Sequence, residues 1–155
     1  MKKIGIGLDY SNICKDYNTV YLDRDNSDPA TMKCIRSVLA WLDELLGEII
    51  EEFAYKTYRL NHAPTVNLSE IVSKRFLFYS LEKEITLQTY LLHHEDKTYN
   101  TLAQWASESS DSLLLKNDEE GEGLYFFVEE NSTVHAWLKE RLKAYSLDDV
   151  PFEEK

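Results

Sequence analysis

Two aspartates separated by one residue follow a short strand-forming run in the segment TVYLDRDNS. Residues 19–22 are β-branched, aromatic or aliphatic, and Asp23 and Asp25 come directly after them. Carboxylates are the side chains that bind Mg²⁺ at sites of phosphate chemistry, so the pair is a candidate for metal-dependent phosphoryl transfer. The structural interpretation is a strand exit followed by a turn and a helix N-cap, where acids are favourable beside the positive helix end. We adopt the structural interpretation and keep the chemical one as the alternative.

The segment TVYLDRDNS resembles the first motif of the haloacid dehalogenase-like phosphatases, in which a strand ends in D-x-D. The resemblance implies that Asp23 is the nucleophile and that Asp25 handles the leaving-group proton, with Mg²⁺ beside them. Asn26 stands where that family has threonine, valine or glycine. The late acidic pair Asp148 and Asp149 follows an expected helix instead of a strand. The resemblance is therefore confined to this one segment.

The opening IGIGLDYSN resembles the first strand of the ribonuclease-H-like and sugar-kinase/actin folds, which ends at a metal- or phosphate-binding aspartate. The resemblance implies that role for Asp9. Glu129 and Glu130 end another expected strand directly before a helix, where a second metal carboxylate could lie. The alternative function is thus a Mg²⁺-dependent phosphoryl-transfer enzyme or nuclease that uses Asp9, Asp23, Asp25, Glu129 and Glu130.

The elements expected around these acids decide between the two interpretations. Residues 3–8 and 19–22 have strand character, and the residues between them are too few for a parallel crossover, so we expect an antiparallel β-hairpin. Such a hairpin would place Asp9 at one end and Asp23 and Asp25 at the other. We therefore expect no catalytic site, no metal site and no cofactor.

The rest of the chain alternates helical and strand patterns. Asp28 and Pro29 open a long amphipathic helix over residues 29–53, because apolar residues then recur at spacings of three and four. Further strands are expected at 54–60, 84–92, 112–116 and 124–128, and further helices from 67, 100 and 132 onward. The sum is about six strands and four helices. We predict one α+β domain over residues 1–155, a mostly antiparallel sheet with helices packed on it, and a loosely ordered tail from about residue 146.

Charge and composition limit the function classes. The 155 residues carry a formal net charge of −11, which disfavours binding of nucleic acid as a bulk polyanion. No apolar run approaches the roughly 20 residues of a membrane span. Cys14 and Cys34 are too few for a disulfide framework and lack the spacing of a redox or zinc motif. We predict a cytoplasmic protein.

An interaction role is the remaining function. Tyrosine is favoured at protein interfaces, and six of the ten tyrosines are not assigned to the core by their spacing: Tyr10, Tyr17, Tyr55, Tyr58, Tyr99 and Tyr125. The loop NDEEGEG between the expected strands at 112–116 and 124–128 carries four acids. We predict a non-catalytic adaptor, inhibitor or regulatory module that binds a basic protein surface, with homodimerisation through the 29–53 helix as an option. The predicted interaction residues are Asp118, Glu119, Glu120, Glu122 and Tyr125.

Overall fold

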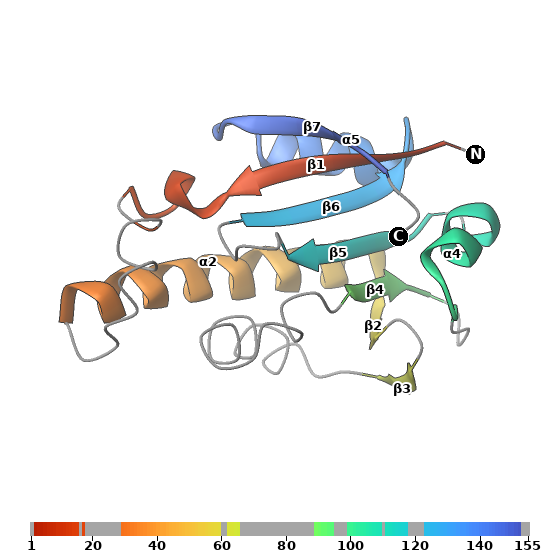
Figure 1. Ribbon diagram of the computed structural model, residues 1–155, viewed down its shortest axis with the longest axis horizontal. Helices are drawn as coiled ribbons and strands as arrows, with labels where there is room; N and C mark the ends of the chain where they lie inside the picture. Colours follow the sequence, from red (N-terminus) through yellow and green to blue (C-terminus); the bar gives the residue numbers. More distant parts are fainter. Residues whose placement is uncertain are drawn as a thin grey trace.

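The structure is a computed structural model that describes residues 2–15, 17, 29–59, 62–65, 89–94, 99–109, 111–117 and 123–152. The described strands form one antiparallel sheet in the order β3-β2-β4-β5-β6-β1-β7 (Figure 1). Their bounds are β1 Lys3–Asp9, β2 Lys56–Arg59, β3 His62–Thr65, β4 Thr89–His93, β5 Leu113–Asn117, β6 Gly123–Glu129 and β7 Leu147–Pro151. The helices among the described residues are η1 Tyr10–Asn12, α2 Pro29–Phe53, α4 Leu102–Glu108 and α5 Thr133–Arg141. The predicted α+β class with a largely antiparallel sheet is confirmed.

β1 lies between β6 and β7, which corrects the expected N-terminal hairpin. Every residue of β1 has an antiparallel partner in β6, from Lys3 opposite Glu129 to Asp9 opposite Gly123. Residues 4–8 also pair with residues 151–147 of β7 on the other side. Both hydrogen-bonding edges of β1 are therefore occupied, and no edge remains for residues 19–22, which lie outside the described residues. The hairpin was expected because few residues lie between the strand-forming segments 3–8 and 19–22. The alternation of side chains within one strand, however, does not show which other strand pairs with it.

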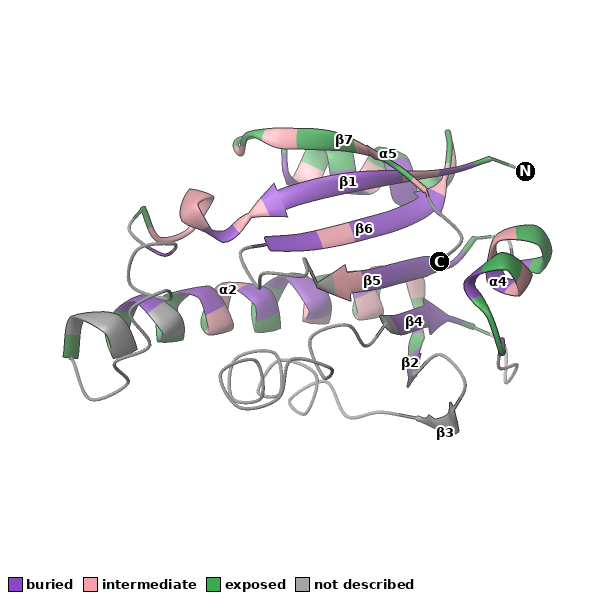
Figure 2. Cartoon of the chain, viewed as in Figure 1, coloured by how far each residue is buried: buried purple, intermediate pink, exposed green. Residues whose placement is uncertain are grey.

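The α2 helix has the apolar stripe that its sequence predicts. Its fully buried side chains face the sheet, and Figure 2 shows this buried side as a line along the helix. The helix ends in a Schellman-type turn, in which Ala54 has a left-handed φ of 53° and the Tyr55 amide donates to the Ile50 carbonyl at 3.1 Å. The stripe consists of Val38, Leu42, Leu45, Leu46 and Ile49, each 0% exposed.

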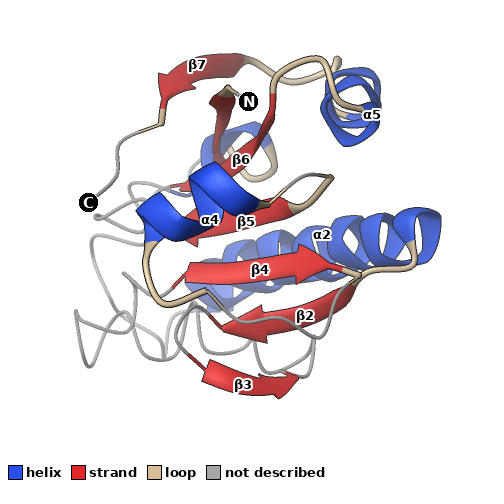
Figure 3. Cartoon of the chain, turned by 90° about the vertical axis from the view of Figure 1, so that its right-hand side faces the viewer, coloured by secondary structure: helices blue, strands red, loops and turns tan. Residues whose placement is uncertain are grey.

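Helices cover both faces of the sheet, and each face has its own hydrophobic cluster. The α2 face contains Leu113 and Leu115 of β5 and is completed by α2 and α5. The opposite face contains Leu114 of β5 and is completed by α4 and by Phe152 after β7 (Figure 3). Because successive strand residues point to opposite faces, the run of leucines in β5 supplies both clusters.

The two glycines of β1 leave room for aromatic rings on the α4 face. A Cβ at Gly5 would lie 2.5 Å from Cε1 of Phe127 and 2.7 Å from the Val150 carbonyl oxygen. A Cβ at Gly7 would lie 3.3 Å from the ring of Tyr125. The alternation of glycine with isoleucine in IGIG therefore lets two rings of β6 lie against the backbone of β1.

Two edge strands differ from the sequence expectations. β3 covers residues to which no element was assigned, and its Pro64 is compatible with an edge strand because proline lacks a backbone donor. β7 forms within the segment after residue 146 to which no element was assigned; its acids Asp148 and Asp149 are exposed and its pairing partner lies far away in the sequence. The helix expected from residue 67 lies outside the described residues.

Candidate functional site

Asp9 ends β1, and its carboxylate caps the next turn. One Asp9 carboxylate oxygen accepts the Ser11 backbone N–H at 2.8 Å, which makes Asp9 the N-cap of η1. The side-chain amide of Asn12 donates to the Asp9 carbonyl oxygen at 2.9 Å. The side chain thus has the structural role of a helix cap in this short turn.

Glu129 and Glu130 lie at the other end of β1. Glu129 is opposite Lys3, and the Glu130 carboxylate lies 3.6 Å from the Lys2 amine in an exposed ion pair. Asp9 lies six positions after Lys3 in the extended strand β1, which corresponds to about 20 Å. The alternative set of metal carboxylates is therefore divided between two ends of the sheet.

Two parts of the predicted sites lie outside the described residues. They are Asp23 with Asp25, and the acidic loop with Asp118, Glu119, Glu120 and Glu122. Within the part of the chain that is described, no three His, Cys, Asp or Glu side chains are grouped so that they could hold a metal ion. Asp9 was expected to lie far from Asp23 and Asp25 because the N-terminal hairpin would place them at opposite ends. The structure contradicts that hairpin.

The expected hairpin that carries the acidic loop is present. β5 and β6 pair from Leu114 opposite Phe127 to Asn117 opposite Leu124, so residues 118–122 connect the paired ends of these strands. The same end of the sheet carries Asp9, because Asp9 lies opposite Gly123. The acidic loop therefore joins the sheet at the end where β1 leads into η1.

Tyr125 is partly exposed, unlike the other five tyrosines that spacing did not assign to the core. The other five side chains are between 1% and 4% exposed and belong to the two clusters: Tyr10, Tyr17, Tyr55, Tyr58 and Tyr99. Spacing did not assign them to the core, but they fill space between the sheet and its covering segments. Tyr125 lies on the α4 face of β6 opposite Lys116 and Gly7, on the same hairpin as the acidic loop.

The outward side of α2 is acidic. Its exposed acids follow one another over the second half of the helix, and the described exposed bases of α2, Lys33 and Arg36, lie nearer its start. Arg141 of α5 donates to the Glu48 carboxylate at 2.8 Å and 3.0 Å, which ties α5 to this side. The acids are Asp43, Glu44, Glu48, Glu51 and Glu52.

Lys3 is a buried cation that the sequence pattern did not single out. Lys3 is 7% exposed. Its amine donates to the Ser109 carbonyl oxygen at 2.8 Å and lies 4.5 Å from the centroid of the Trp105 ring. Burial lowers the Lys3 pKa, and the charge of Glu129 opposes this shift. Ser109 is the C-cap of α4, so the cation stabilises the negative end of that helix. Because side chains alternate along residues 3–8, Lys3 lies on the same face of the sheet as Gly5 and Gly7.

His135, in the first turn of α5, is buried. The residue is 4% exposed, and its Nδ1 accepts the Asn131 backbone N–H at 3.0 Å. Nε2 is buried and has no hydrogen-bond partner among the described residues. Burial, followed by the charge of Lys139, lowers the His135 pKa, while Glu130 and Asp149 oppose the shift. The neutral ring holds the turn before α5.

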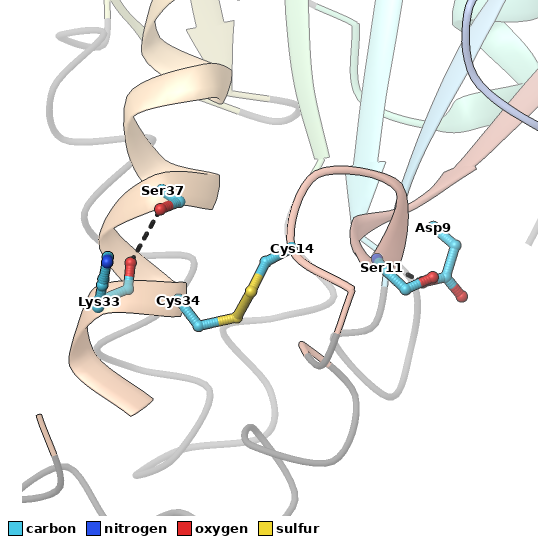
Figure 4. Close-up of a disulfide and its surroundings, with 6 residues drawn as sticks. All are labelled: Asp9, Ser11, Cys14, Lys33, Cys34 and Ser37. Carbon is cyan, nitrogen blue, oxygen red and sulfur yellow. Dashed lines mark hydrogen bonds between the residues drawn. A yellow bond between two sulfur atoms is a disulfide. The ribbon is translucent and has the colours of Figure 1, made fainter. Parts of the chain in front are cut away.

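Cys14 and Cys34 form a disulfide, although their spacing matches no known cysteine motif. Their Cα atoms are 5.8 Å apart, which is within the usual range for disulfides. Figure 4 shows the bond between the turn after η1 and the N-terminal part of α2, with Asp9 and Ser11 on the far side of that turn. Positions separated by 20 in the sequence become neighbours only through the path of the chain, which the spacing rules for short motifs do not detect.

Comparison of the chain with protein-family models, with curated proteins and with solved structures gives no match. Among the described residues, no helix combines the length and the apolar character that crossing a membrane requires. The fold and the site geometry are therefore the basis for a functional proposal.

Proposed function

We propose that this protein is a non-catalytic interaction module that binds a basic protein surface through the β5–β6 hairpin. The observation that carries the proposal is the position of Tyr125, a partly exposed aromatic side chain on the hairpin whose connecting loop holds Asp118, Glu119, Glu120 and Glu122. An aromatic anchor beside a group of charges is a common composition for a recognition surface. Opposite charges would steer a basic partner toward it.

The positions of Asp9, Glu129 and Glu130 do not support a metal site that combines the two ends of β1. Asp9 caps η1, and Glu129 and Glu130 lie about 20 Å away along the strand. A two-carboxylate metal site needs its ligands to meet at one ion. Adaptor, inhibitor and regulatory roles all fit the proposal, and the partner class common to them is a cationic protein.

Self-association through α2 is not part of the proposal. The apolar stripe of α2 is covered by the sheet, and the outward side carries five exposed acids. Two copies in contact through this side would bring like charges together, which is unfavourable. We propose a monomer in the cytoplasm as the binding unit.

The location bears on the disulfide. Cytosolic disulfides are usually transient and redox-sensing, whereas permanent ones belong to oxidising compartments. A cytoplasmic location therefore requires that the Cys14–Cys34 bond be reversible.

Two matched charge reversals test where the basic partner binds. The probe is a fluorescein-labelled lysine decapeptide, and its affinity is measured by fluorescence anisotropy. E119K/E120K changes the hairpin loop, and E51K/E52K changes the outward side of α2. Each variant moves the formal net charge from −11 to −7, since two reversals add four.

We expect the hairpin variant to weaken binding by roughly tenfold or more, while the α2 variant changes it by less than about threefold. The wild-type affinity should fall steeply between about 50 mM and about 300 mM NaCl, because the contact is electrostatic. Equal losses in the two variants would mean that only net charge acts and would overturn the assignment to the hairpin. Binding that does not respond to salt would overturn the basic partner class.

A further inference from the structure

The disulfide adds a covalent bond between two segments, the η1 turn and α2, that also share the hydrophobic cluster of the α2 face. Cys14 follows η1, which is fixed to β1 by the hydrogen bond between the Ser11 amide and Asp9. The Ser146 amide, next to β7, donates to the Asn12 side-chain oxygen at 3.2 Å. Cys34 belongs to α2 and is packed in the cluster of the α2 face at 6% exposure. The disulfide is thus a covalent link between the η1 turn and α2.

The two cysteines of the disulfide differ in solvent exposure. Cys14 is partly exposed, whereas Cys34 is buried. Lys15 follows Cys14, and Lys33 and Arg36 are exposed on α2 near Cys34. Their positive charges favour the approach of an anionic thiol such as glutathione, and Asp16, which follows Lys15 in the sequence, carries the opposite charge.

We propose that Cys14 and Cys34 are a reversible thiol–disulfide pair that controls the attachment of the η1 turn to α2. In reduction, a glutathione thiolate attacks the Cys14 sulfur, forms a mixed disulfide there and releases Cys34 as a thiolate that takes up a proton. A second glutathione thiolate attacks the glutathione sulfur of the mixed disulfide, which releases Cys14 and forms glutathione disulfide. Two electrons thus pass from two glutathione molecules to the protein. Oxidation by glutathione disulfide follows the same steps in reverse.

This inference does not depend on the proposed binding function. It concerns the junction between η1 and α2, and its readouts are the redox state and the melting temperature. A disulfide that closes a loop of this length stabilises a chain mainly by restricting the unfolded state. Oxidation of the full chain should therefore raise the melting temperature by about 10 °C.

The experiment equilibrates the purified full chain in glutathione buffers from fully reduced to fully oxidised. Thiols are then alkylated and counted by intact mass, and the melting temperature is measured in each buffer. We expect an interconversion between two alkylated thiols and none, without added denaturant, accompanied by the rise in melting temperature. The control C14S/C34S should melt like the reduced protein in every buffer.

Single variants test the direction of attack. In folded C34S the remaining Cys14 thiol should react readily with iodoacetamide, whereas in folded C14S the buried Cys34 thiol should react at least about tenfold more slowly. Two alkylated thiols in every buffer would overturn the pair itself. A disulfide that is reduced only after unfolding would overturn its reversibility, and equal melting temperatures would overturn its control of the junction. Equal reactivity of the single variants would overturn attack at Cys14.

Discussion

Substitution of Gly5 by alanine tests the packing of β1 against β6 and β7. The added Cβ would lie 2.5 Å from Cε1 of Phe127 and 2.7 Å from the Val150 carbonyl oxygen. The Phe127 ring is 6% exposed and lies 5.5 Å from the Phe152 ring, so it has little space to move away. The Val150 oxygen belongs to the backbone of β7, and its displacement would disturb the pairing of β7 with β1.

The expected cost follows from two opposing terms. Overpacking of a filled site costs about 1–3 kcal/mol. The loss of glycine flexibility in the unfolded chain returns about 0.4–1 kcal/mol. Gly5→Ala should therefore lower the free energy of unfolding by about 1–2 kcal/mol. Gly47→Ala is the matched control, because a Cβ at Gly47 meets nothing within 4 Å in the middle of α2, and it should add up to about 1 kcal/mol.

Urea unfolding followed by tryptophan fluorescence and circular dichroism measures both variants in the same oxidised buffer. With a slope of about 2 kcal/mol per molar urea, the midpoint should fall by about 0.5–1 M for Gly5→Ala and rise by up to about 0.5 M for Gly47→Ala. Gly7→Ala should fall between Gly5→Ala and the wild type, because its nearest neighbours are side chains at 3.1–3.3 Å. If Gly5→Ala is as stable as the wild type, or if Gly5→Ala and Gly47→Ala shift in the same direction, the reasoning about β1 is wrong.

Three further predictions use other parts of the structure. Ala54→Gly should raise the free energy of unfolding by about 1 kcal/mol in the same urea assay, since Ala54 has a left-handed φ of 53° that glycine adopts without strain; an unchanged midpoint would contradict the turn geometry. Burial lowers the folded-state pKa of His135 below its ordinary value of 6.5, so its contribution to stability is complete above pH 6.5 and is lost as the pH falls from 6.5 through the folded-state pKa. In melts from pH 8 to pH 5, His135→Gln should lose less stability than the wild type, and parallel curves would exclude His135 as the cause. Saturating Mg²⁺ or Mn²⁺ should leave the melting temperature unchanged, and a rise that is absent in D9N or in D23N/D25N would revive the enzyme alternative.

Local sequence patterns predicted the helices and strands that are determined by residues close together in the sequence. The apolar spacing of α2, the start of α5 near residue 132 and the apolar runs of β5 and β6 all lie within one element or one hairpin. The expected bounds of these elements agree with the structure to within a few residues.

Pairing between distant segments could not be predicted in the same way. β1 has strand character, but nothing in its residues indicates that β6 and β7 are its neighbours. β7 was missed because Asp148 and Asp149 interrupt the apolar pattern, and these acids are compatible with an edge strand whose side chains are exposed. The pairing of Cys14 with Cys34 depends on the same long-range organisation.

Sequence reasoning located the candidate acids at the ends of strands, but it could not show how these residues lie relative to one another. The acids of Glu129 and Glu130 were placed correctly at the end of a strand, and Asp9 was placed correctly at the end of β1. Their separation by the length of the strand depends on the antiparallel register of β1 with β6. The tyrosines were judged from spacing alone, and spacing does not show which covering segment buries a side chain. Tyr125 is partly exposed because its part of the α4 face contains glycine and lysine neighbours.

The position of β1 between β6 and β7 has a consequence for the order of events during biosynthesis. A ribosome makes residues 3–9 long before residues 123–129 and 147–151, the two strands that pair with them. Until then the apolar side chains of β1 have no sheet to join, and a chaperone could bind them on the nascent chain. The sheet can therefore close around β1 only after translation has passed residue 151.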